Sequence, residues 1–212
     1  MTTAALAALV IAGVSACGDW VARARRRVWL EYLCKPATLG ALTWTAVALS
    51  PASDAGARRS WFVAALVCSL AGDVVLMLPG DLFVAGLGAF LVGHLAYLAG
   101  LWAHGPGALA IVVAAGVVVV VVAPFGLRVL RALRAHASLR APVAIYMLVI
   151  AAMLATALAT GNVLAGVGAT LFVSSDTMIA WNRFVRPFRG ADVAIMVTYH
   201  LGQAGLVLSL LR

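Results

Sequence analysis

Two aspartates, Asp73 and Asp176, are the side chains of this sequence best suited to chemistry. Each lies inside a long apolar run that carries no other charge, LVCSLAGDVVLML and GATLFVSSDTMIAW. On insertion scales a carboxylate at the centre of a membrane helix costs about 2.5–3.5 kcal/mol, so acids in such runs are typical of functional sites. Two carboxyl groups in different protonation states can divide the roles of proton donor and base, which indicates acid–base catalysis.

The rest of the composition shows which solvent surrounds these acids. Hydrophobic residues occupy 65% of the 212 positions, and the mean hydropathy is +1.08. This apolar content exceeds what the core of a soluble protein of this length can bury. The sequence therefore predicts an integral membrane protein. No stretch has the composition of a soluble domain, so we expect residues 1–212 to form a single transmembrane domain.

Polar or charged breaks divide the chain into eight apolar stretches. Each is long enough for a helix that crosses the hydrocarbon core, which takes about 20 residues. We predict an all-α polytopic membrane protein with eight transmembrane helices near residues 2–20, 30–50, 61–79, 83–103, 108–127, 142–159, 162–181 and 192–211. The valine-rich stretch AIVVAAGVVVVVVAPF would suit a strand in water, but in lipid a helix satisfies its own backbone hydrogen bonds.

The arginines are distributed unevenly among the connections between these helices. The odd-numbered connections hold Arg23, Arg25, Arg26, Arg27, Arg128, Arg131, Arg134, Arg140, Arg183, Arg186 and Arg189, whereas the other side holds only Arg58, Arg59 and Arg212. By the positive-inside rule the odd-numbered connections face the cytoplasm and both termini lie outside, in a bacterial inner membrane. The net charge of +8 thus reflects topology, and we expect no nucleic-acid partner.

Polar side chains from six predicted helices fall at similar depths in this topology. With a rise of about 1.5 Å per residue, Asp73 and Asp176 lie roughly 8–9 Å from the cytoplasmic ends of their helices. Such a polar layer predicts a cavity in the cytoplasmic half of the membrane. Ser69 precedes Asp73 by one turn, so its hydroxyl could hydrogen-bond that carboxyl group. The other candidate site residues are Lys35, His94, Tyr97, Tyr146, Tyr199 and Gln203.

The two halves of the chain resemble each other. Asp73 is followed about 21 residues later by HLAYL, and Asp176 about 24 residues later by YHLGQ. Both acids lie on predicted helices that run in the same direction, so the pattern indicates a parallel four-plus-four internal repeat rather than the inverted repeat of many transporters.

Five segments of the chain resemble one membrane-protein family. YLCKPATLGAL, CSLAGDVVLML, FLVGHLAYLAGL, GATLFVSSDTMIAWNRF and YHLGQAGLVL are similar, in order and spacing, to the YhhN-type lysoplasmalogenase family of eight-helix membrane proteins. The resemblance implies hydrolysis of the vinyl ether bond of lysoplasmalogens to a fatty aldehyde and a glycerophospho-base, with Asp73 and Asp176 as the essential acids. It further implies a lysophospholipid substrate, contact with membrane lipids, and no metal or other cofactor.

Vinyl ether hydrolysis suits the two acids. A proton delivered to the outer alkene carbon leaves an oxocarbenium ion, which water captures. One protonated carboxyl group would be the donor, for which we take Asp73, although the sequence does not decide between the two. The other, ionised, would stabilise the cation and orient or deprotonate water. Tyr199 and Gln203 could position water, His94 and Tyr97 could complete the hydrogen-bond network, and Lys35 could bind the lipid phosphate.

Other functions and roles are compatible with these residues. The main alternative is a lipid or small-molecule transporter, in which the acids would relay protons or bind substrate. A structural pair that only joins helices is another, as is an ion pair between Lys35 and Glu31, four residues earlier. An intramembrane aspartyl protease would need the motif G-x-G-D, whereas this chain reads LAGD. No His or Cys pair has the spacing of metal ligands.

The remaining acids and histidines are predicted to be peripheral. We expect Asp19, Asp54, Asp81 and Asp192 to be solvated or helix-terminal charges, His104 and His136 to lie in interfacial loops, and His200 to be a core residue.

Overall fold

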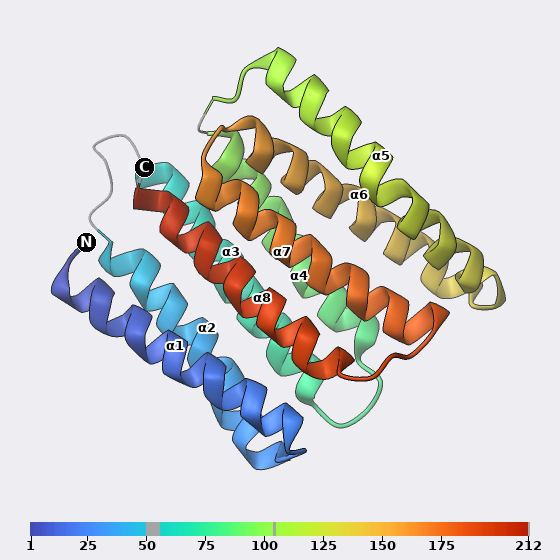
Figure 1. Cartoon of the computed structure of the whole chain (residues 1–212), viewed down its shortest axis with the longest axis horizontal. Coiled ribbons are helices and arrows are strands. Elements are labelled where there is room, and N and C mark those ends of the chain that lie inside the picture. The colour runs from blue at the N-terminus through green and yellow to red at the C-terminus, as the bar shows by residue number, and fades with distance from the viewer. Residues whose placement is uncertain (50–55, 104, 212) are drawn as a thin grey trace.

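The computed structural model of the chain describes residues 1–49, 56–103 and 105–211. This part of the chain is all-helical and has no strand (Figure 1). The long helices are α1 (Thr3–Ala24), α2 (Val28–Ala48), α3 (Gly56–Met77), α4 (Phe83–Trp102), α5 (Ala108–Ala132), α6 (Ala137–Ala159), α7 (Val163–Ala180) and α8 (Ala191–Leu208). Short 3-10 turns follow α5 and α8 at Leu133–Ala135 and Ser209–Leu211, and a π-helical turn, Trp181–Val185, follows α7.

Four helices extend well beyond their predicted ends. α1 continues to Ala24 instead of ending at 20, and α3 begins at Gly56 instead of 61. α5 continues to Ala132 instead of ending at 127, and α6 begins at Ala137 instead of 142. The extensions of α5 and α6 carry arginines, whose side chains are stable in water beyond the apolar stretch. The end of an apolar run therefore marks where the chain leaves the hydrocarbon, while the helix itself continues.

Seven of the helices in the described ranges are long and apolar enough to cross a membrane, which is the pattern of an integral membrane protein. α2 is the helix that is not among them. It carries Glu31 and Lys35 within an otherwise apolar stretch. The crossing of α2 as an eighth span stays a prediction, as does the internal repeat.

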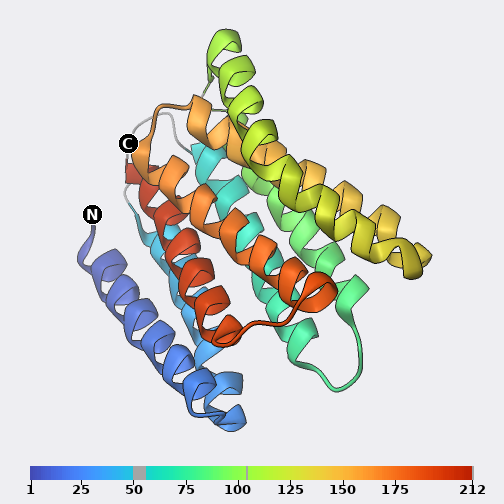
Figure 2. The same ribbon diagram turned by 45° about the vertical axis from the view of Figure 1, so that its right-hand side comes forward.

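Consecutive helices pack as antiparallel hairpins, α1 with α2, α3 with α4, α5 with α6 and α7 with α8. Further contacts of α2 with α3, α4 with α6, α6 with α7, and α8 with both α1 and α2 close the bundle. α5 packs chiefly against α6 and lies at the edge of the molecule in both views (Figures 1 and 2). The other helices thus enclose most of the interior, and α5 covers it from one side.

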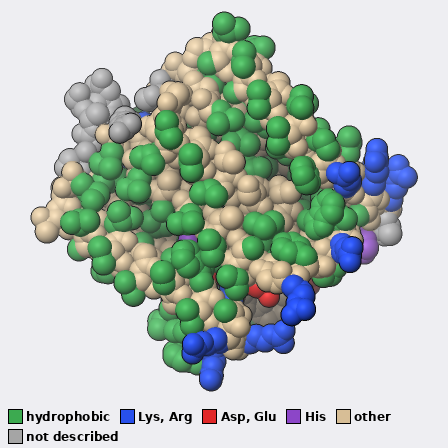
Figure 3. Space-filling model, viewed as in Figure 1, with side chains coloured by type: hydrophobic (Ala, Val, Ile, Leu, Met, Phe, Trp, Pro, Cys, Tyr) green, Lys and Arg blue, Asp and Glu red, His purple; other side chains and the backbone are tan. Residues whose placement is uncertain are grey.

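The two ends of the bundle differ in composition. The connections that follow α1, α3, α5 and α7 lie on one side of the molecule, and the chain termini lie on the other (Figure 1). Lys and Arg side chains gather along the edges of the molecule where the connections after α1, α3, α5 and α7 lie (Figure 3). Exposed Trp44, Trp61 and Trp102 lie near the opposite helix ends, where interfacial tryptophans are expected.

The contact between α7 and α8 depends on glycines. A Cβ at Gly168 would lie 2.6 Å from the Leu206 backbone nitrogen, and one at Gly202 would lie 2.8 Å from that of Phe172. Small residues let helix backbones approach closely, as in other membrane bundles. Because these glycines hold α7 against α8, they set the separation between Asp176 on α7 and Tyr199 on α8.

Two charges expected to be solvated or peripheral are buried. Asp19 is fully buried, because it continues the face of α1 on which Ala8, Ala12 and Ala16 pack against the bundle. The prediction considered only how close Asp19 lies to the helix end, and not which face of the helix it shares. Arg58, counted among the charges of the outer side, is also buried and donates hydrogen bonds to the backbone oxygen (3.0 Å) and hydroxyl (3.2 Å) of Ser209.

The other predictions of peripheral side chains are confirmed for the residues that the structure describes. Asp81, Asp192 and His136 are exposed, as predicted. Asp54, His104 and Arg212 lie outside the described residues.

Gly202→Leu should destabilise the protein, because its side chain would push α7 away from α8. Overpacking of a closed interface costs about 1–3 kcal/mol. Gly13→Leu is the matched control, since no atom lies within 4 Å of a Cβ at Gly13 of α1. Thermal unfolding in detergent, followed by circular dichroism, should give a lower Tm for Gly202→Leu only. Equal Tm values would contradict a closed interface between α7 and α8.

Candidate functional site

Asp73 lies in the last turns of α3 and is bound from two other helices. Its Oδ1 lies 2.9 Å from Nζ of Lys35 on α2. Its Oδ2 accepts a hydrogen bond of 2.8 Å from the hydroxyl of Tyr199 on α8. Both members of the ion pair are buried. One carboxylate thus joins three helices through charge-assisted hydrogen bonds, the stronger kind in a protein interior.

A hydrogen-bond chain continues from Asp73 into the bundle. Gln203, one turn after Tyr199 on α8, donates from Nε2 to the Tyr199 hydroxyl at 3.4 Å. Tyr97 of α4 donates to Oε1 of Gln203 at 2.5 Å. A tyrosine hydroxyl has a single hydrogen to give. Each donor therefore has one acceptor, and the chain Tyr97, Gln203, Tyr199, Asp73 fixes the orientation of the Asp73 carboxylate.

Asp176 on α7 has a different environment. Its Oδ2 accepts a 2.5 Å hydrogen bond from the hydroxyl of Tyr146 on α6. Nε2 of His94 on α4 lies 3.7 Å from the same oxygen, too far for a hydrogen bond. Among the described residues, no Lys or Arg forms an ion pair with Asp176. The two acids thus differ in their partners, a cation and a hydroxyl for Asp73 and a single hydroxyl for Asp176.

His94 has a tautomer set by its backbone contact. Its Nδ1 lies 2.6 Å from the carbonyl oxygen of Phe90. Because a carbonyl oxygen only accepts hydrogen bonds, Nδ1 carries the hydrogen, and in the neutral ring Nε2 holds a free electron pair. This nitrogen is buried and has no hydrogen-bond partner in the described structure. An acceptor therefore points toward Asp176.

Both aspartates line one cavity of about 400 Å³. Lys35 and Tyr199 lie in the same wall as Asp73. In Figure 3, acidic atoms are visible in a hollow between basic side chains at the lower edge of the molecule. The predicted cavity at the arginine-rich end of the bundle is therefore present, and it contains both candidate acids.

Two arginines that sequence reasoning assigned only to topology lie in the wall of this cavity. Arg23 is held by Asp19 (Nε to Oδ2, 3.4 Å) and by Glu31 (Nη2 to Oε1, 2.6 Å). The alternative pairing of Glu31 with Lys35 is therefore wrong. The one available signal was the spacing of four residues between Asp19 and Arg23, which places both on one helix face.

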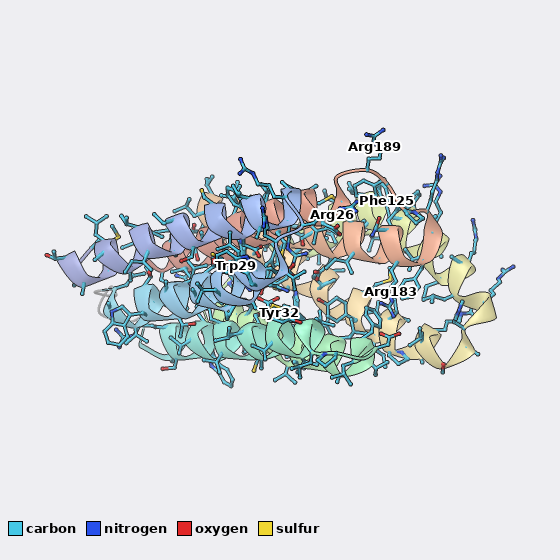
Figure 4. All side chains as sticks on the ribbon, turned by 90° about the horizontal axis from the view of Figure 1, so that it is seen from below. Arg26, Trp29, Tyr32, Phe125, Arg183 and Arg189 are labelled. Atoms are coloured by element: carbon cyan, nitrogen blue, oxygen red, sulfur yellow. The ribbon has the colours of Figure 1, made fainter. Side chains whose placement is uncertain are left out.

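Arg183 is the second arginine of the cavity wall. It donates to both carboxylate oxygens of Asp81, at 2.9 and 2.8 Å, and its guanidinium lies 4.2 Å from the centre of the Phe83 ring. Seen from below, Arg189 projects away from the bundle, whereas Arg183 lies within its outline (Figure 4). Arg183 thus joins the π-helical turn to the α3–α4 connection in the wall of the cavity.

Ser69 and His200 do not reach the acids. Ser69 is buried against Gly93 of α4, and the described part of the chain has no hydrogen bond between it and Asp73. Both Asp73 oxygens are turned toward Lys35 and Tyr199 instead. His200 accepts a 3.1 Å hydrogen bond from the indole of Trp20, as a buried residue between α8 and α1. The described residues contain no cluster of three or more His, Cys, Asp and Glu side chains that could hold a metal ion.

Known proteins resemble this chain over most of its length. The model of the YhhN family matches residues 30–210. Lysoplasmalogenase TMEM86B of Homo sapiens is 39% identical over 165 residues, which are 76% of this chain and 67% of that protein. A lysoplasmalogenase of Mycobacterium bovis is 33% identical over 178 residues, 79% of this chain and 66% of that protein. No solved structure matches the chain. These matches confirm the resemblance inferred from the sequence motifs, and the chain belongs to the YhhN family.

Proposed function

We propose that this protein is a lysoplasmalogenase, a membrane hydrolase that cleaves the vinyl ether bond of lysoplasmalogens to a fatty aldehyde and a glycerophospho-base. The observation that carries the proposal is the pair of aspartates, Asp73 and Asp176, in the wall of one cavity. The family and the names of its curated relatives support the substrate class. A lysophospholipid would reach the cavity from the surrounding bilayer.

The surroundings of the two acids favour Asp176 as the proton donor, the reverse of our expectation from the sequence. Lys35 and Tyr199 both donate to Asp73, and such bonds stabilise an ionised carboxylate. Among the described residues, no lysine or arginine pairs with Asp176 to stabilise its charge. The free electron pair of His94 Nε2 would repel an ionised Asp176 and is compatible with a protonated one. Asp176 therefore carries the proton, and Asp73 the negative charge.

The reaction then proceeds with each group in one role. Asp176 delivers its proton to the outer alkene carbon, and the Asp73 carboxylate stabilises the oxocarbenium ion that results. Water adds to the oxocarbenium carbon and gives its proton to the Asp176 carboxylate, which regenerates the acid. The hemiacetal transfers its hydroxyl proton to the glycerol oxygen as the carbon–oxygen bond breaks. Aldehyde and free glycerol hydroxyl leave, with one water consumed.

The other site residues would act on the two acids. Lys35 and the chain through Tyr199, Gln203 and Tyr97 would keep Asp73 ionised and oriented. Tyr146 and His94 would orient the Asp176 carboxyl group so that its proton points toward the substrate. Such preorganisation reduces the reorganisation needed in the transition state.

Asp73→Asn and Asp176→Asn should each lower aldehyde release from a lysoplasmalogen by at least about 100-fold, since a positioned general acid and a preorganised charge facing the transition state each contribute about that much or more. Aldehyde is measured in detergent, where a transporter has no second compartment and would release none. The saturated lyso-ether counterpart is the substrate control and should yield no aldehyde from any variant. Full activity of either variant, folded as judged by thermal unfolding, would remove that residue from the mechanism.

His94→Leu should lower kcat by about 10- to 100-fold, because it removes the acceptor that faces Asp176. His94→Gln keeps an acceptor at a similar reach and should retain most activity. His200→Leu is the matched control, since His200 is equally buried but bonds to Trp20 away from the acids. If His94 had only a structural role, His94→Leu and His200→Leu would lower kcat equally, and that result would contradict the role proposed for His94.

We further propose eight spans in a bacterial inner membrane, with both termini outside and the cavity in the cytoplasmic half. The arginine-rich connections at one end of the bundle support this orientation. Alkaline phosphatase fused after Leu211 should be active, and green fluorescent protein there should be dark. Fluorescent protein fused after Arg189 should fluoresce. The opposite pattern at both positions would reverse the orientation, and fluorescence at both would remove the last span.

A further inference from the structure

A second, apolar cavity of about 80 Å³ adjoins the one that holds the acids. It lies among α4, α5, α6 and α7, beneath the peripheral helix α5. The two cavities share wall residues, namely Leu76, Phe83, Phe90, Asp176 and Ile179. They therefore border each other, and Asp176 is the acid that lines both.

The apolar cavity offers little to a polar occupant. Its polar wall groups are the Tyr146 hydroxyl, the Asp176 carboxyl group and the Thr177 hydroxyl, and the first two bond to each other. A buried water needs two to four polar partners, so a cavity with this wall favours hydrocarbon. The adjoining cavity carries Lys35, Asp73, Arg23 and other charged groups. The pair of cavities thus has one polar and one apolar half, joined at Asp176.

We propose that the apolar cavity is the subsite for the hydrocarbon chain of the substrate, an inference that rests on the proposed function. A lysoplasmalogen has a polar glycerophospho half and an apolar chain, which meet at the vinyl ether. With the chain in the apolar cavity and the glycerol in the polar one, the double bond lies at Asp176. The narrow cavity holds only the first carbons of the chain, and the remainder continues into the bilayer.

Gly126 and Met147 set the width of this subsite. Gly126 of α5 and Met147 of α6 both line the cavity, and a Cβ at Gly126 would collide with the methyl group of Met147. The Met147 methyl group, the end of a flexible side chain, occupies the position that a side chain at residue 126 would take. Because Gly126 has no side chain, the cavity has room for both this methyl group and a ligand. A large side chain at 126 would drive Met147 into the space that the substrate chain needs.

The expected effect is on placement of the double bond. The chain gains little free energy by leaving the bilayer for another apolar site. A displacement of about 1 Å at the reacting carbon, however, can cost on the order of 100-fold in rate. Gly126→Leu should therefore lower kcat/KM by about 10- to 100-fold for a long-chain substrate and leave a substrate whose chain ends before Met147 within about twofold of the original protein.

Gly116→Leu is the matched control, on the same helix but exposed, with no atom within 4 Å of its Cβ position. It should behave as the original protein on both substrates. Met147→Ala combined with Gly126→Leu reopens the space and should restore most long-chain activity. The proposal is overturned if Gly126→Leu loses activity equally on both chain lengths without rescue, or if it loses none.

A binding measurement separates this inference from the proposed function. A saturated lyso-ether analogue, which cannot be hydrolysed, is titrated into each variant in detergent by calorimetry. Gly126→Leu should weaken binding of the long-chain analogue by about tenfold, because the chain and the Met147 side chain would then be overpacked in the same space, with no change in Gly116→Leu. If the original protein released no aldehyde, yet Gly126→Leu alone weakened binding of the analogue, the chain subsite would be supported and the hydrolase function would be contradicted. Equal binding by all variants would show that only bulk membrane lipid occupies the cavity.

Discussion

The ion pair between Lys35 and Asp73 is the constraint on which the other features depend. A buried charge that loses its partner is strongly destabilising, so α2 and α3 must meet at this point. Tyr199 extends the connection to α8 and, through Gln203, to Tyr97 on α4. Four helices from both halves of the chain are thereby held at one carboxylate. The same requirement explains why α2 is less apolar than its neighbours: it brings a lysine into the bundle.

The difference between the two acids follows from this arrangement. The one lysine of the sequence lies beside Asp73, and Asp176 is left with a tyrosine hydroxyl and the electron pair of His94. Two chemically identical side chains thus acquire different surroundings within a shared cavity, as acid–base catalysis requires. Asp176 also stands where the polar cavity meets the apolar one, which is where the vinyl ether of an amphiphilic substrate would lie.

Much of the fold could be predicted, because hydrophobic length and arginine placement are properties of single segments. The helices of the described residues fall close to the predicted stretches. The errors concern helical phase and partners on other helices. Asp19 was judged by its distance from a helix end, but the phase of α1 buries it, and it pairs with Arg23 of the same helix. Ser69 shares a helix with Asp73, yet α2 and α8 supply both partners of that carboxylate.

The sequence by itself determined that the protein is helical and belongs in a membrane, that its arginines mark one end, and that Asp73 and Asp176 are its unusual acids. These follow from transfer free energies of side chains and backbone, which act residue by residue. Only the tertiary structure decided which acid is bound to Lys35, that Arg23 and Arg183 line the cavity, and that an apolar cavity meets Asp176. Such pairings depend on the rotation and approach of helices far apart in the chain, and packing at glycines such as Gly168 and Gly202 sets that approach.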